Sequence, residues 1–349
     1  MDLEVMNTVM QERIVKFNTF VMEQDIEKIP VGLFNGKMGI CIYFYQQARL
    51  TQNKKYERFA GKLLDSLYSQ VHKDLSVGFE NGLIGICYGI NYLLENDFVK
   101  GNVNYILKEF DDKIFQKVYF SKNSFTIDEA ILFVQAGLHF CSRLSNKNLA
   151  QNEKILFENM VIRLLNTIET NLVGIEKNMA EPFFFSPFVY FPVIYLKLLQ
   201  KIYSLDFYNY KIDKVCDIWN DRLLSTYPLL QSHRFLLAKA MENVNKKRKH
   251  DTWQFHIEHL IKQSNIDYII STEFKNKNIS LNSGVSFFYF LLKDSNMLSD
   301  KIKVDVALKL TESEFWNDFE QSNSELKKNY ISLMIGLSGV ILVYQDTQK

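Results

Sequence analysis

The sequence predicts an all-α protein, and three observations support this prediction. Apolar residues recur at three- and four-residue spacing through most of the 349 residues, which is the period of helices that bury one face. Only five prolines and 14 glycines interrupt these segments. The third observation is a repeat: Asn-Gly-x-x-Gly-Ile-Cys begins at Asn35 and again at Asn81, 46 residues later, and a weaker Gly-x-x-Gly copy begins at Gly336. A period of this length accommodates one helical hairpin, so we expect stacked helix pairs.

The helix-period segments form about seven consecutive pairs, and in most pairs the first member is amphipathic and the second is apolar nearly all round. First members are predicted over residues 3–24, 54–72, 103–118, 150–172, 213–224, 252–264 and 302–310. Second members are predicted over residues 36–50, 82–95, 128–144, 187–203, 229–243, 284–293 and 331–344. This pattern is typical of an outer helix layer around an inner one, as in an (α/α) toroid or barrel.

The starts of the inner helices carry recognisable signals. Gly36 and Gly82 each open a Gly-x-x-Gly step, where a missing Cβ permits a turn or a close backbone approach. Asp128 begins the third inner helix and is expected near its N-cap, since acidic side chains favour this end of a helix. Pro187 suits the first turn of the fourth, and Pro192 is expected to kink that helix.

The repeat extends from Gly36 to Gly339 and no linker interrupts it, so we expect a single domain over residues 1–349. The terminal copy resembles the first two and no polar capping repeat is evident, which favours closure into a ring with a central cavity at one end of the inner helices.

Composition excludes several classes of protein. With 47% hydrophobic and 23% charged residues the chain can bury a large core, and a net charge of +1 gives no bias toward nucleic acid. The most apolar stretch, residues 182–199, is interrupted by proline, serine and lysine, so we expect no membrane insertion. Four dispersed cysteines without an export signal favour reduced thiols and a cytoplasmic location.

Seven helical hairpins with Gly-x-x-Gly at the start of inner helices resemble the lanthionine synthetase C-like (LanC-like) family. At the residue level the resemblance rests on the glycine pairs Gly36/Gly39, Gly82/Gly85 and Gly336/Gly339. It implies an α/α toroid that closes thioether rings in ribosomally made peptides.

The resemblance also implies a zinc ion, held by a cysteine at the fifth inner helix and by a Cys-His-Gly sequence at the sixth. Such a zinc would hold a substrate thiol as the nucleophilic thiolate. Here the sixth inner helix begins Asn282-Ser283-Gly284, and residues 229–234 at the fifth contain no cysteine. Neutral amide and hydroxyl groups suit Zn²⁺ poorly. We therefore expect a degenerate family member without a cofactor.

Cys41 and Cys87 lie at equivalent positions of the repeat. Two interpretations are open: a relocated pair of thiolates, or small apolar side chains where helices pack.

His233 and Arg234 are the candidate catalytic residues, because they lie together at an inferred inner-helix start. A histidine can act as a general acid or base near neutral pH, and an arginine can bind a peptide carboxylate or a phosphate through two hydrogen bonds. The alternative is a partly buried pair with a structural role. Asp128 is either one member of an acid/base pair or a helix-terminal residue.

We predict a LanC-like protein of a lanthipeptide-type (lantibiotic) modification pathway that binds a precursor peptide or a partner enzyme without zinc. Besides His233 and Arg234, the predicted binding residues are Asn35, Glu80, Asn81, Asp128, Asn282 and Ser283. One alternative is an active cyclase, thioether-forming or metal-free, with a rearranged site. Another is a purely structural assembly scaffold. The sequence leaves open whether the protein is an enzyme.

Overall fold

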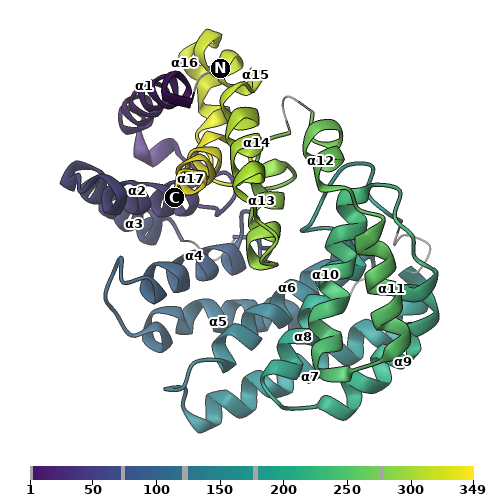
Figure 1. Cartoon of the computed structure of the whole chain (residues 1–349). Helices are drawn as coiled ribbons and strands as arrows, with labels where there is room; N and C mark the ends of the chain where they lie inside the picture. Colours follow the sequence, from purple (N-terminus) through teal and green to yellow (C-terminus); the bar gives the residue numbers. More distant parts are fainter. Residues whose placement is uncertain (1–2, 72–74, 120–124, 176–179, 276–277) are drawn as a thin grey trace. The chain divides into compact units, whose positions relative to one another are not determined.

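The computed structural model describes residues 3–71, 75–119, 125–175, 180–275 and 278–349, and every regular element in these ranges is helical (Figure 1). The all-α prediction is therefore confirmed. The helices form two compact units: unit 1 contains residues 1–100 and 270–349, and unit 2 contains residues 101–269. The single domain over residues 1–349 stays a prediction. Within the described ranges, no helix has the length and apolarity needed to span a bilayer.

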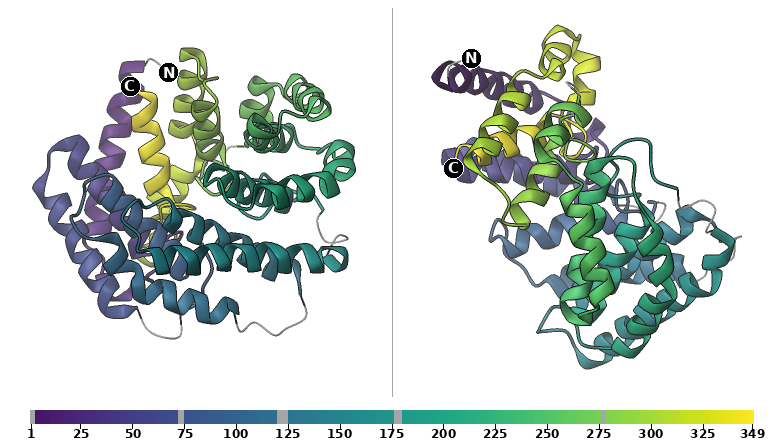
Figure 2. Two further views of the ribbon diagram at one scale, coloured as in Figure 1. Left: turned by 90° about the horizontal axis from the view of Figure 1, so that it is seen from below. Right: turned by 45° about the vertical axis from the view of Figure 1, so that its right-hand side comes forward.

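Unit 1 has a row of four core helices in which each contacts the next. In order of contact they are α13 (Val285–Asp294), α17 (Leu337–Thr347), α2 (Lys37–Thr51) and α4 (Leu83–Glu95). Figure 2 shows α17, in yellow, beside the purple helices of the amino-terminal segment. The last helix of the chain therefore joins the two segments of unit 1.

Three amphipathic helices contact these core helices: α1 (Leu3–Met22), α3 (Lys54–Gln70) and α14 (Asp300–Thr311). The remaining elements are the 3₁₀ turn η1 (Ile26–Lys28), the short helices α15 (Glu314–Gln321) and α16 (Ser324–Lys327), and the 3₁₀ turn η4 (Lys328–Tyr330). No helix was predicted between residues 310 and 331, so α15 and α16 are additions to the expected hairpins.

Unit 2 has three core helices, α6 (Ile127–Leu144), α8 (Phe191–Ser204) and α10 (Gln231–Arg248), and α8 contacts both of the others. The helices packed around them are α5 (Val103–Tyr119), α7 (Gln151–Ile175), α9 (Asn209–Ser225) and α11 (Asp251–Lys262). The short α12 (Ile266–Tyr268) and the π-helical turn η3 (Ile269–Glu273) follow them.

The predicted kink at Pro192 and several predicted helix starts are wrong; α17, for example, begins at Leu337 rather than at residue 331. Pro192 does not kink α8. It lies in the first turn of this helix, after the N-cap residue Tyr190, where a backbone N–H would have no partner within the helix, so proline costs no hydrogen bond there. Residues 187–190 therefore precede the helix. At α6 Asp128 lies near the N-cap, as expected. The N-cap residue is Thr126: its Oγ1 accepts from the backbone N–H of Glu129, and the Glu129 carboxylate accepts from the N–H of Thr126.

Candidate functional site

Each core helix of unit 1 begins after a turn of the same length, and we call these four segments the rim turns: residues 30–36, 76–82, 278–284 and 330–336. In three of them the first helical N–H donates to the carbonyl seven residues earlier. These bonds are Lys37 N to Pro30 O at 2.6 Å, Leu83 N to Ser76 O at 2.9 Å and Val285 N to Asn278 O at 2.9 Å. These three rim turns thus cap their own helices, so the first helical N–H groups of α2, α4 and α13 are not available to bind an anion.

The repeated first glycine is explained by close packing of the backbone. A Cβ atom added at Gly36 would lie 2.3 Å from Pro30 O, and one added at Gly82 would lie 2.4 Å from Ser76 O. Their φ angles, −141° and −115°, are accessible to any residue. The sequence suggested that glycine is needed here either for a turn or for a close backbone approach. The structure supports the close approach.

Successive rim turns are joined by backbone hydrogen bonds at one equivalent position, two residues before the glycine. We call these bonds the belt: Asn282 N to Met334 O at 2.7 Å, Met334 N to Phe34 O at 3.4 Å, and Phe34 N to Glu80 O at 2.8 Å. The belt fixes the spacing of the four turns.

The next position of each turn, directly before the glycine, reaches solvent. The side chains of Asn35 and Asn81 are exposed, and that of Ser283 is half-buried. Asn81 Oδ1 also accepts a hydrogen bond from the Asn35 N–H at 3.3 Å. The structure thus brings together Asn35, Glu80 and Asn81 in adjacent turns, and Asn282 and Ser283 lie in another rim turn of the same unit.

The other candidates belong to unit 2. Asp128 is exposed in the first turn of α6. His233 and Arg234 lie in the first turn of α10.

His233 is completely buried, and both of its ring nitrogens have partners. Nε2 faces the backbone N–H of Ser186 at 3.1 Å, and since an N–H can only donate, Nε2 is the acceptor. Nδ1 therefore carries the proton and donates to Glu181 Oε1 at 2.8 Å. The rings of Phe185 and Tyr190 have centroids 5.7 and 5.0 Å from that of His233. These contacts favour a structural role over general acid–base catalysis.

The Arg234 guanidinium is bound to backbone carbonyl groups. Nε donates to Pro228 O at 2.6 Å, Nη1 to Gln263 O at 3.2 Å and Nη2 to Leu229 O at 3.1 Å. Its guanidinium carbon also lies 4.3 Å from the centre of the Tyr227 ring. A substrate carboxylate would have to displace these bonds, so Arg234 also fits a structural role best.

Glu181 is the residue that connects this cluster, and it was not among the predicted site residues. Its carboxylate accepts from the N–H groups of Leu229 at 2.6 Å and Leu230 at 3.0 Å, in addition to His233. It therefore supplies the side-chain acceptor at the start of α10, where negative charge is favoured by the helix dipole.

We expect Glu181→Ala to lower the free energy of unfolding by about 3 kcal/mol, because the His233 and Leu230 donors, which are shielded from water, lose their acceptor and each unsatisfied buried donor costs about 1–3 kcal/mol. Urea unfolding followed by circular dichroism measures this change. Glu109→Ala, at an exposed glutamate on α5, is the control. Equal stability of the two variants would contradict the role of Glu181.

The residues at the positions implied for zinc do not fit this ion. Asn282 and Ser283 carry neutral donors, and the His233 ring is already paired at both nitrogens. In the described part of the chain, no three His, Cys, Asp or Glu side chains are grouped so that they could hold a metal. No chemical step is therefore assigned to zinc.

The cysteines have the features of packing residues. All four are buried, and the Cys41 thiol donates to Ala60 O at 3.4 Å. Burial raises the pKa of the Cys41 thiol far above its usual value and that of Cys141 to about 12. Both thiols are protonated at neutral pH, which supports the packing interpretation over a thiolate pair for Cys41.

Sequence reasoning missed a buried charged cluster in unit 2. Asp111, on α5, accepts from two residues of α6: Oδ1 lies 2.7 Å from His139 Nε2 and Oδ2 lies 2.9 Å from Arg143 Nε. All three side chains are only 5–6% exposed. Nothing in the sequence marks these residues, because they are distant along the chain and occur in unremarkable helical segments.

Residues 27–182 match the family model of lanthionine synthetase C-like proteins. The matched stretch covers less than half of the chain and includes the rim turns before α2 and α4. No match is found among curated proteins. The all-helical architecture is consistent with the helical toroid of this family.

Proposed function

Because residues 27–182 match the family model of lanthionine synthetase C-like proteins, we propose that this chain is a member of that family and binds a ribosomally made peptide at the rim turns, without zinc-dependent ring closure. One observation carries the proposal: the belt holds a rigid row of turns with exposed amide side chains, while the zinc-ligand positions carry Asn282 and Ser283.

Amide side chains suit this task because each can donate to and accept from a peptide backbone. Asn35 and Asn81 lie on adjacent turns whose spacing is fixed by backbone bonds, so little freedom is lost when a peptide binds them. Glu80, exposed beside them, adds a negative charge that would attract a basic residue of the peptide.

We expect the double variant Asn35→Ala/Asn81→Ala to bind a model precursor peptide at least tenfold more weakly than the unaltered protein, since each lost hydrogen bond contributes about 1 kcal/mol. The probe is a fluorescently labelled peptide that contains cysteine and dehydroalanine, and its anisotropy reports binding. Gln11→Ala, at an exposed amide on α1, is the matched control. Unchanged binding by the double variant would remove the rim turns from the proposal.

The same probe separates binding from cyclisation. With added zinc, we expect the free thiol of the peptide to disappear no faster than it does without the protein. Thiol alkylation and mass spectrometry measure this rate. A protein-dependent rate, with about one zinc per chain by elemental analysis, would instead establish the cyclase alternative.

A further inference from the structure

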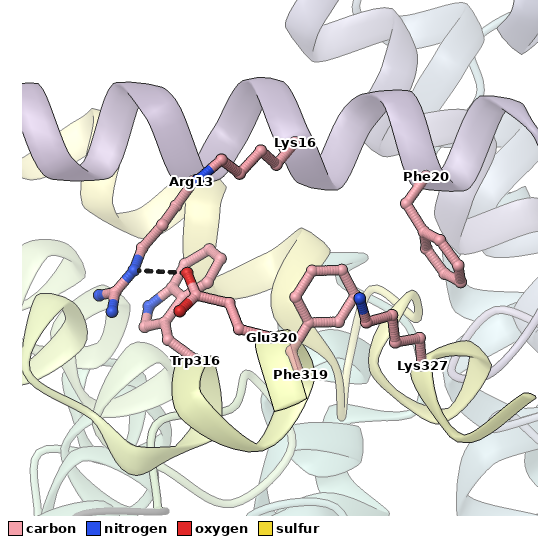
Figure 3. Close-up of a pocket in the computed structure, with 7 residues that line it drawn as sticks. All are labelled: Arg13, Lys16, Phe20, Trp316, Phe319, Glu320 and Lys327. Atoms are coloured by element: carbon pink, nitrogen blue, oxygen red, sulfur yellow. Dashed lines mark hydrogen bonds and ion pairs between the residues drawn. The ribbon is translucent and has the colours of Figure 1, made fainter. Parts of the chain in front are cut away.

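A second candidate site lies in unit 1, on elements outside the rim turns. Figure 3 shows a pocket of about 380 Å³ between α1 and α15, which is within the range of ligand-binding pockets. Arg13, Lys16 and Phe20 line it from α1, at the three- and four-residue spacing of one helix face. The opposite side is formed by α15 and by Lys327 at the end of α16.

The apolar part of the pocket is rigid. Trp316 is completely buried, and its indole N–H donates to Leu310 O at 2.9 Å. Phe319 is 4% exposed, and its ring centroid lies 5.6 Å from that of Phe17 and 5.7 Å from that of Phe20. A ligand would therefore reach the half-buried ring of Phe20, which the buried ring of Phe319 holds in position.

The polar part carries an excess of positive charge. Arg13 is partly neutralised, since its Nε lies 3.2 Å from Glu320 Oε1 and its Nη1 donates to Thr311 O at 2.8 Å. Lys16 and Lys327 make no ion pair with the described residues, and Lys327 Nζ lies 5.2 Å from the centre of the Phe319 ring. The whole chain has a net charge of only +1, so three cationic side chains and one carboxylate around a single pocket are a local excess of positive charge, and they lie beside aromatic rings.

We infer that this pocket binds an acidic peptide segment that carries an aromatic side chain. The aromatic ring packs against the half-buried ring of Phe20, and flanking carboxylates pair with Lys16 and Lys327. A peptide fits better than a free aromatic acid because the pocket is open: the Glu320 side chain is 41% exposed and Lys16 is exposed. A peptide would cover these side chains, whereas a single ring would leave them in water. This inference does not depend on the proposed function of the rim turns.

The test uses a labelled peptide with one phenylalanine flanked by three aspartates on each side, titrated with the full-length protein. We expect saturable binding that weakens as salt is added, as exposed ion pairs require. Lys16→Glu/Lys327→Glu should weaken it at least tenfold. Lys62→Glu, at an exposed lysine on α3 of the same unit, is the control and should change it less than twofold.

Three further results would each overturn the inference. An absence of binding is one, and equal losses in the double variant and in Lys62→Glu are another. The third is equal binding of a peptide in which alanine replaces the phenylalanine, because only charge would then be recognised. Competition by phenylacetate as effective as that by the peptide would assign the pocket to small aromatic acids instead.

Discussion

The variant Asp111→Ala is expected to lower the free energy of unfolding by about 3–5 kcal/mol, the usual cost of removing one partner from a buried ion pair. The carboxylate of Asp111 is the partner of Arg143 and His139, which are 5% exposed and have little access to water. Without it, a guanidinium charge stays buried without its counterion. Urea unfolding followed by circular dichroism measures the change.

The neighbouring residue supplies the control for this experiment. Asp112 lies on the same helix, is exposed and forms no ion pair with the described residues. Asp112→Ala should change the stability by no more than about 0.5 kcal/mol, as is usual for surface positions. Similar losses for the two variants would show that the buried cluster does not stabilise the packing of α5 on α6.

The variant Gly85→Ala is expected to destabilise unit 1 by about 3 kcal/mol, near the upper end of what overpacking costs. An added Cβ would lie 2.0 Å from Phe79 O and 3.1 Å from Leu33 Cβ. The first contact is with backbone, which cannot move without shifting the rim turn that joins the belt at Glu80. Thermal and urea unfolding both measure this loss.

A glycine in open space provides the opposite expectation. Gly61 lies within α3, and the nearest atom to an added Cβ would be the Tyr45 hydroxyl at 3.9 Å. Gly61→Ala should therefore stabilise the protein by up to about 1 kcal/mol through helix propensity alone. If both glycine variants were equally stable, close packing at Gly85 would not be the reason for the repeat.

Many of the helices could be predicted because the glycines of the repeat are required by contacts between residues that are close together in the sequence. A glycine is needed wherever a rim turn passes under its helix, so Gly36 and Gly82 mark the starts of α2 and α4. The neighbouring positions of Asn35 and Asn81 follow from the same repeat. These features depend on residues close together in sequence, which pattern analysis can detect.

Other features depend on partners that no local pattern reveals. Glu181 and His233 meet across 52 positions, so the sequence could not show that both ring nitrogens of the histidine are occupied. The pocket beside α1 was missed because α15 lies where no helix was predicted. Pro192 was misread because its effect depends on where the helix begins, and the start of α8 lies four residues later than expected.

The belt also bears on how the protein is made. It joins the turns before α2 and α4 to those before α13 and α17, yet residues 101–269 are synthesised between these two pairs. At roughly 5–20 residues per second, tens of seconds separate the emergence of α4 from the ribosome and that of α17. During this interval the apolar face of α2 lacks α17, while the segment that forms unit 2 emerges. The first hundred residues therefore complete their fold only after α17 has emerged, and the apolar face of α2 needs protection from aggregation until then.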